Sequence, residues 1–144
     1  MGGSLDFTFK QTGSKKNKTN LMVWWIHLTI SVIIVIPIAI VYGFWTNLVF
    51  NVNIDTVDEH SIFKAIMGFY LGFALMSTIG IFRPIYWKTA TITNILFMFG
   101  LGIGRIISII FDGIPSTIFI LGTFGELIIG FYGLYQLKRQ PNFN

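Results

Sequence analysis

Residues 100–126 read GLGIGRIISIIFDGIPSTIFILGTFGE, and this stretch holds three ionisable side chains inside or beside two apolar runs. They are Arg105, Asp112 and Glu126. An ionisable group in such a run costs free energy unless it has a partner, so this stretch is the candidate functional site. Asp112 and Gly113 predict the end of one helix, and Pro115 predicts the first turn of the next. The stretch therefore predicts a helical hairpin with charged groups in both of its helices.

The whole chain has the composition of a membrane protein. Apolar types make up 53% of its 144 residues and Asp, Glu, Lys and Arg only 11%, against about a quarter in soluble domains. Several apolar runs approach the ~20 residues that a helix needs to cross a bilayer. Since these runs leave little of the chain outside the membrane, it forms one domain, and a sizeable aqueous active-site domain is excluded.

We expect four membrane-spanning helices, over about residues 21–49, 61–82, 89–111 and 115–136. Because the connections are short, consecutive helices must be antiparallel neighbours. The predicted fold is an all-α, integral membrane, antiparallel four-helix bundle, up-down-up-down, over residues 21–139. Residues 1–20 are polar and lack apolar periodicity, so they predict a disordered cytoplasmic tail, and residues 140–144 form a second cytoplasmic tail.

The charges alternate from one connection to the next. The N-terminal tail, the second connection (RPIYWK, 83–88) and the C-terminus are basic, whereas the first and third connections are acidic. The positive-inside rule then places both termini in the cytoplasm. The formal charge of +4 is read as this topology signal, and nucleic acid is not an expected partner. The absence of cysteine excludes disulfides, thiolate metal sites and CxxC redox chemistry.

Arg105, Ser108 and Asp112 follow the spacing i, i+3, i+7 and share one face of the third helix. On the fourth helix, Glu126 lies in a stripe of small residues that predicts an inward-facing carboxylate. The other members of the stripe are Gly122, Gly130 and Gly133. We predict an Arg105–Glu126 pair, because each charge alone in hydrocarbon costs at least ~2.5 kcal/mol.

Lys64 begins the second span, and we expect it near Asp112 or Glu59, at the upper part of the same cluster. The candidate ligand-binding or structural charge cluster thus comprises five residues. They are Lys64, Arg105, Ser108, Asp112 and Glu126. His27 and His60 lack metal-ligand spacing and are expected to be interfacial polar residues, so neither a metal nor a cofactor is predicted.

Other residues are expected at the ends of the helices or between them. Aromatic side chains near helix ends, Tyr42 and Trp87 among them, predict anchors at the headgroup level. Two sets of small residues predict close helix packing, within the bundle or in a homodimer. They are the Ala65, Gly68 and Gly72 stripe and the run Gly100-x-Gly102-x-Gly104.

Several motifs give the chain a family resemblance over about residues 57–139. They are HSIFKAIMGFYLGFAL from His60, IFRP at 81–84, GLGIGRIISIIFDGIP at 100–115, and Glu126. In these the chain resembles the uncharacterised bacterial four-helix membrane proteins known as domain of unknown function 4345. The resemblance implies a bundle in the bacterial inner membrane and no established activity. Lys64 stands where the family usually has arginine, which keeps the charge but loses the bidentate fork.

Two functions are compatible with these features. The first is a small membrane protein that binds a polar or anionic ligand, or a partner protein, through an outward-facing charged pocket. The second is a membrane enzyme or a subunit of a quinone-linked redox complex, since the family is distantly similar to DoxX-like proteins, some of which associate with such oxidoreductases. The pair could instead serve only to fix helix register.

Overall fold

The computed structural model describes residues 25–50 and 52–139, and every regular element in these ranges is helical. The elements are α2 (Ile26–Phe44), α3 (Thr46–Phe50), α4 (Val57–Phe82), the 3-10 turn η1 (Pro84–Tyr86), α5 (Trp87–Asp112) and α6 (Thr117–Arg139). The predicted tails at 1–20 and 140–144, and the first residues of the first predicted span, lie outside the described residues.

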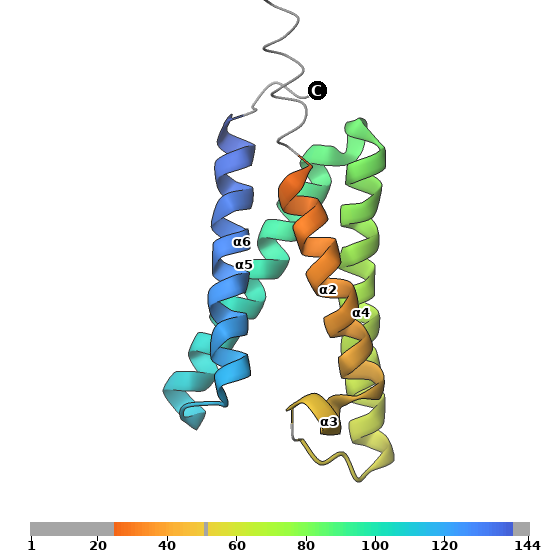
Figure 1. The fold of residues 1–144 in the computed structure, drawn as a ribbon, viewed down its shortest axis with the longest axis vertical. Helices are drawn as coiled ribbons and strands as arrows, with labels where there is room; N and C mark the ends of the chain where they lie inside the picture. Colours follow the sequence, from red (N-terminus) through yellow and green to blue (C-terminus); the bar gives the residue numbers. More distant parts are fainter. Residues whose placement is uncertain (1–24, 51, 140–144) are drawn as a thin grey trace, which may run out of the picture.

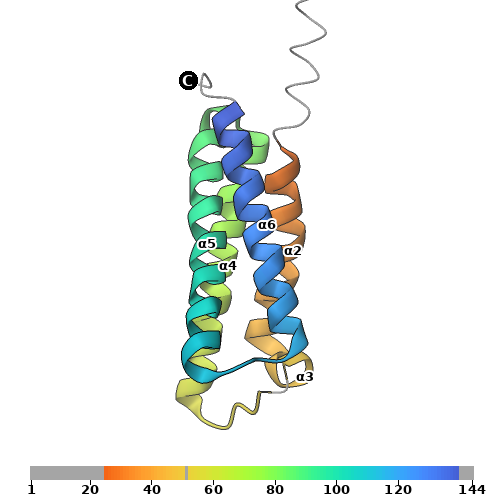
Figure 2. The ribbon, with the colours of Figure 1, turned by 90° about the vertical axis from the view of Figure 1, so that its left-hand side faces the viewer.

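The four long helices, α2, α4, α5 and α6, are each long and apolar enough to cross a membrane. Successive long helices run in opposite directions, so α2 begins and α6 ends on the side where α4 passes into α5 (Figures 1 and 2). Large apolar side chains are exposed on the outer faces of all four helices, as expected of a surface that meets lipid. The predicted all-α, antiparallel four-helix membrane bundle is therefore confirmed, and the protein is a multi-pass membrane protein.

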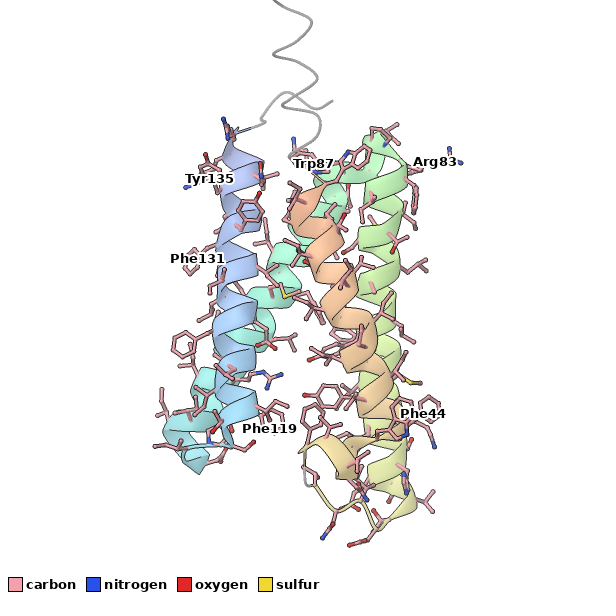
Figure 3. The ribbon with its side chains drawn as sticks, in the orientation of Figure 1. Phe44, Arg83, Trp87, Phe119, Phe131 and Tyr135 are labelled. Carbon is pink, nitrogen blue, oxygen red and sulfur yellow. The ribbon has the colours of Figure 1, made fainter. Side chains whose placement is uncertain are left out.

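The two ends of the bundle carry opposite charges. Basic side chains lie at the end formed by η1 and the last turn of α6, which we call the basic end, and they are Arg83, Lys88, Lys138 and Arg139. Acidic side chains lie at the other end, which we call the acidic end, and they are Asp55, Asp58, Glu59 and Asp112. Figure 3 shows Arg83 at the basic end and Phe44 toward the acidic end.

The helices pack as two pairs. α2 packs mainly on α4 and α5 mainly on α6, α4 also contacts α5, and contacts between α2 and α6 are few. The pairs diverge toward the acidic end, where α3 follows α2 (Figure 1). This divergence is what leaves room inside the bundle for a site.

Local sequence explains where the helices end. Thr56 and Glu59 form a capping box at the start of α4, in which the Glu59 carboxylate accepts bonds of 2.9 Å from the backbone N–H groups of Asp55 and Thr56. α5 ends at Asp112 as predicted, and Gly113 follows with φ of 103°, a conformation that favours glycine. The first predicted span is broken at Trp45, where α2 gives way to the short α3.

Glycines allow α5 and α6 to pack closely, as the small-residue stripe around Glu126 predicted. A Cβ placed on Gly133 would come within 2.8 Å of the Ile95 side chain, and one on Gly130 within 3.3 Å of Phe99. Within the bundle, the predicted close packing is absent at four other glycines, Gly68, Gly72, Gly100 and Gly104, because a Cβ on any of them would meet nothing within 4 Å. Homodimer contacts at these glycines stay a prediction. Those four positions face open space, since the helices diverge there or the glycine lies on an outer face.

Two apolar clusters form the core. One lies in the middle of the bundle around Tyr42, Tyr70 and Phe97, and the other lies toward the basic end around Leu28, Trp87 and Ala90. Tyr42 and Trp87 are therefore buried core residues, and their prediction as interfacial anchors was wrong. Each lies on the face of its helix that meets a neighbouring helix, and a position near a helix end does not reveal that face.

Candidate functional site

Arg105 on α5 and Glu126 on α6 form an ion pair inside the bundle. The Nη2 atom of Arg105 lies 3.0 Å from Oε1 of Glu126, and the two side chains are only 19% and 12% exposed. Gly122 lies beside the pair, and a Cβ there would be in ordinary van der Waals contact with the guanidinium carbon, at 3.8 Å. The structure thus brings together the two residues that the sequence predicted as a pair, and among the described residues it contains no other ion pair.

The pair leaves hydrogen-bonding capacity unused. The Oε2 atom of Glu126 is buried and has no hydrogen-bond partner among the described residues. Arg105 carries five N–H donors in a rigid fork, of which the contact with Glu126 engages one. A buried carboxylate oxygen without a donor is costly, so the site is incomplete as a purely structural contact.

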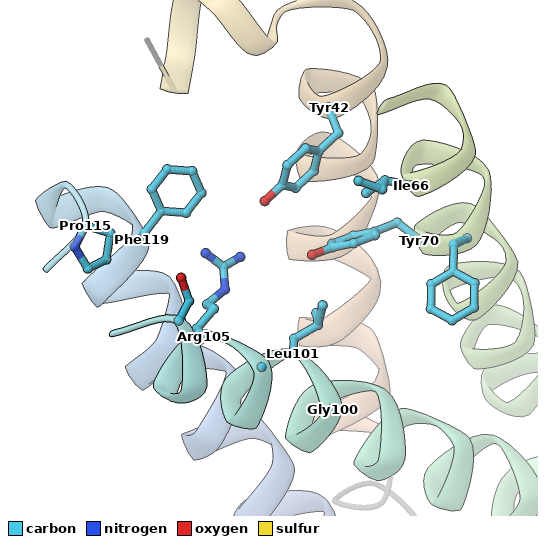
Figure 4. A pocket seen from close by; sticks show the side chains of 11 residues that line it. Tyr42, Ile66, Tyr70, Gly100, Leu101, Arg105, Pro115 and Phe119 are labelled. Atoms are coloured by element: carbon cyan, nitrogen blue, oxygen red, sulfur yellow. The ribbon is translucent and has the colours of Figure 1, made fainter. Parts of the chain in front are cut away.

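Two tyrosines turn their hydroxyl groups toward Arg105. Tyr42 comes from α2 and Tyr70 from α4, and Figure 4 shows both hydroxyls directed at the guanidinium group. Both residues are nearly buried, at 9% and 4% exposure. All four long helices therefore contribute a polar group to one point, which we call the central cluster: Tyr42, Tyr70, Arg105 and Glu126.

Aromatic rings close the central cluster on the side of the acidic end. The guanidinium carbon of Arg105 lies 5.2 Å from the centre of the Phe119 ring, a cation–π distance. Phe119 stacks on Phe50 of α3, with ring centres 4.9 Å apart, and Phe50 lies equally close to Tyr42. The short helix α3 thus supplies the ring that connects α2 to α6 where the two long helices separate.

Two cavities meet at the central cluster. The first, about 540 Å³, lies mainly between α4 and α5, and we call it the α4–α5 cavity. The second, about 410 Å³, lies mainly between α2 and α6, and we call it the α2–α6 cavity. Both are within the size range of small-molecule sites. Arg105, Tyr42 and Tyr70 line both cavities, whereas Ser108 lines only the first and Glu126 only the second.

The remaining predicted site residues make no described hydrogen bond or salt bridge with the ion pair, although Ser108 lines the α4–α5 cavity together with Arg105. Ser108 donates a hydrogen bond of 2.9 Å to Asp112, and both side chains are exposed. Lys64 is exposed on α4, where it lines neither cavity and joins no described salt bridge. Glu59, its expected neighbour, instead caps its own helix. The five predicted residues therefore divide into the Arg105–Glu126 pair, the Ser108–Asp112 pair and a separate Lys64.

A second polar group, which the sequence analysis missed, lies toward the basic end. His27 is fully buried, with its Nε2 atom 3.2 Å from Oγ1 of Thr91. Ser31 donates to the His27 carbonyl oxygen at 2.8 Å, and Asn94 donates to Ser31 at 3.0 Å. These bonds join α2 to α5, so the prediction of an interfacial His27 was wrong. The polar Asn94 within an apolar run was the signal that could have revealed the group.

The described part of the chain contains no group of three His, Cys, Asp or Glu residues that could hold a metal ion. Comparison with known families matches the chain to the family model described as "Domain of unknown function (DUF4345)", over residues 23–137. No curated protein and no solved structure matches the chain.

Proposed function

The chain belongs to the family described as a domain of unknown function, DUF4345, and we propose that it is a binding protein that holds a polar or anionic ligand at Arg105, inside the membrane. The observation that carries this proposal is the position of Arg105. Its guanidinium group lines both cavities and keeps donors that the contact with Glu126 does not engage. A ligand group between the helices would receive hydrogen bonds from Arg105 and from the two tyrosine hydroxyls.

The energetics of the ion pair support binding over a purely structural role. A buried pair is stabilising only when its remaining hydrogen-bonding atoms are also satisfied. Here Oε2 of Glu126 has no partner among the described residues, and the pair borders open cavities on both sides. Charged residues within membrane helices commonly mark the path or the site of a ligand for this reason.

The charge distribution supports an orientation for the site. We propose that the chain lies in the bacterial inner membrane with the basic end, and hence both termini, in the cytoplasm. Arg105 precedes the end of α5 at Asp112 by seven residues, or about 10 Å along the helix. The central cluster would then lie in the outer half of the bilayer and open toward the outer face.

The test compares the protein with a variant that lacks the charges but keeps the hydrogen bonds. In Arg105→Gln/Glu126→Gln two amides replace the ion pair, which avoids leaving one charge buried alone. Each protein is purified in lipid nanodiscs, and the small molecules that remain bound are identified by mass spectrometry. We expect a molecule that is enriched with the natural chain and lost from the double variant. Lys64→Gln, which removes an exposed charge outside the site, is the control and should retain it.

Equal retention by the natural chain and the double variant would contradict the proposal. The alternative is a subunit of a quinone-linked redox complex, in which Arg105 and Glu126 would polarise a lipid-soluble molecule. The apolar walls of both cavities favour a ligand of that solubility. In that case the molecule lost from the double variant would be a quinone, and an oxidoreductase would be recovered with the natural chain. A fully retained protein partner with no small molecule would instead point to a binding site for that partner.

A further inference from the structure

We infer that the ligand is an uncharged amphiphile with one acyl chain, whose head group both donates and accepts hydrogen bonds, and that it occupies the α2–α6 cavity. This inference rests on the proposed function and names the class of ligand for the same site. It follows from the charge balance of the central cluster, from the order of polar and apolar walls along the cavity, and from its opening between two helices.

The charge balance disfavours an anion. Arg105 and Glu126 neutralise each other, so an added anion would leave one uncompensated negative charge in a medium of low polarity. An uncharged head group avoids that cost. It can accept, through a carbonyl oxygen, from N–H groups of Arg105 that the contact with Glu126 does not engage, and it can donate to Oε2 of Glu126 through a hydroxyl. Both functions are needed, because an acceptor alone would leave Oε2 without a partner.

The α2–α6 cavity is the one that offers both groups. Glu126 lines it but does not line the α4–α5 cavity, whereas Arg105 lines both. Its volume of about 410 Å³ is at the small end of the range for ligand sites, which suits one acyl chain better than two. A head group at the central cluster would thus contact the donor and the acceptor from a single position.

The walls of the α2–α6 cavity combine one polar region with apolar walls. The polar side chains of Arg105 and Glu126 lie between the stacked rings of Phe50 and Phe119, which close the cavity toward the acidic end, and an apolar stretch nearer the basic end. That stretch comes from the middle of α2 and α6, at Ile34, Val35 and Ile129. A head group at Arg105 would therefore place its acyl chain along these apolar walls, toward the basic end.

The cavity is also accessible from the side. α2 and α6 make few contacts with each other, and the wall residues Ile34 and Leu121 are 41% and 66% exposed on the surface that faces lipid. Gly125 on α6 lines the cavity, and a Cβ there would meet nothing within 4 Å. An amphiphile can therefore pass between the two helices without first leaving the bilayer.

Three probes with the same oleoyl chain test the head group. Radiolabelled monooleoylglycerol has hydroxyls and an ester carbonyl, methyl oleate has the carbonyl alone, and oleate is an anion that only accepts. Binding of each is measured to the full-length chain in nanodiscs. We expect monooleoylglycerol to bind at least about tenfold more tightly than either of the others, the loss expected when a buried charged acceptor is left unpaired.

Matched glycine variants test the cavity. Gly125→Leu should place a branched side chain in the α2–α6 cavity beside Glu126 and weaken monooleoylglycerol binding by at least about tenfold, since it occupies space that the bound molecule needs. Gly104→Leu, in the α4–α5 cavity, and Gly72→Leu, on the open face of α4, should change it less than about twofold. A Cβ on any of the three glycines would meet nothing within 4 Å, so the three substitutions are matched at the point where the new side chain begins.

The outcomes separate this inference from the proposed function. Tighter binding of oleate or methyl oleate, or an effect of Gly104→Leu with none of Gly125→Leu, would overturn the inference while leaving an Arg105-dependent ligand site. If none of the probes binds and nothing is lost from Arg105→Gln/Glu126→Gln, both proposals fail. The comparison of probes uses the natural chain alone, so it decides the head group even if a glycine variant is unstable.

Discussion

Glu126 presents two carboxylate oxygens to the interior of the bundle, and only Oε1 has a described partner. A single residue thus combines a structural contact with unused binding capacity. The same holds for Arg105, whose planar fork faces Tyr42 and Tyr70 as well as Glu126. At the scale of residues, the central cluster brings together the donors of Arg105, the carboxylate acceptor of Glu126 and two tyrosine hydroxyls that can donate and accept, one group from each long helix.

Removal of one charge should destabilise the protein more than removal of both. Arg105→Gln leaves Glu126 buried without its counter-charge, and we expect it to lower the free energy of unfolding by about 3–5 kcal/mol. Arg105→Gln/Glu126→Gln should cost clearly less, since no net charge remains. Unfolding in mixed micelles measures both values, with Lys64→Gln as a control expected within about 0.5 kcal/mol of the natural chain. A single variant as stable as the natural chain would refute the buried pair.

The buried bond of Asn94 gives a second prediction. Asn94→Ala removes the donor to Ser31, and we expect a loss of about 0.5–1.5 kcal/mol in the free energy of unfolding, the net contribution of a typical hydrogen bond. Asn53→Ala, at an exposed position in the loop before α4, should have little effect in the same unfolding assay. If the two variants are equally stable, the polar group at His27 contributes nothing to the packing of α2 on α5.

At the scale of elements, the hairpin of α5 and α6 is built on glycines that face a neighbouring helix. Gly102 lies against Leu127, and Gly133 lies against Ile95. In each case an added Cβ would come within 2.8 Å of that neighbouring side chain, closer than a normal contact. On α4, by contrast, Gly68 and Gly72 belong to a small-residue stripe but face no other helix. A small-residue stripe therefore permits close packing without requiring it, because the pairing of helices depends on the connections and on the rest of the core.

Glycine substitutions should separate these two kinds of position. Gly133→Val forces a branched side chain into Ile95, and we expect a loss of about 1–3 kcal/mol from overpacking. Gly68→Ala enters open space and should be neutral or raise the free energy of unfolding by up to about 1 kcal/mol, because alanine favours the helix. Thermal unfolding in one detergent compares them. Equal destabilisation by both substitutions would mean that α4 meets another helix at Gly68, for instance in a homodimer.

At the scale of the whole molecule, the charges at the two ends predict the orientation in the membrane. The natural chain has no cysteine, so a single introduced thiol reports on one position without background. We expect Asp55→Cys, at the acidic end, to react in intact cells with a maleimide that cannot cross the membrane. Lys88→Cys, at the basic end, should react only after the cells are opened. The reverse pattern would invert the topology and place the site nearer the cytoplasm.

Much of this protein followed from its sequence. The low charge, the four apolar runs and the short connections predicted the antiparallel membrane bundle, and the burial cost of Arg105 and Glu126 predicted that they meet. These inferences succeed because hydrocarbon penalises every unsatisfied backbone group and every isolated charge, which leaves few structures for such a chain. They depend on local sequence patterns and on large free-energy penalties, and both are evident from the order of the residues alone.

Only the tertiary structure decided which side chains share an interior. Tyr42 and Tyr70 join the central cluster, His27 and Trp87 are buried, and Lys64 lies apart, although sequence position suggested otherwise for Tyr42, His27, Trp87 and Lys64. In a membrane helix the lipid-facing and the inward faces are both apolar, so periodicity does not reveal which face is buried. The rotation of each helix, and the divergence of the two pairs that opens the cavities, are set by packing among all four helices at once.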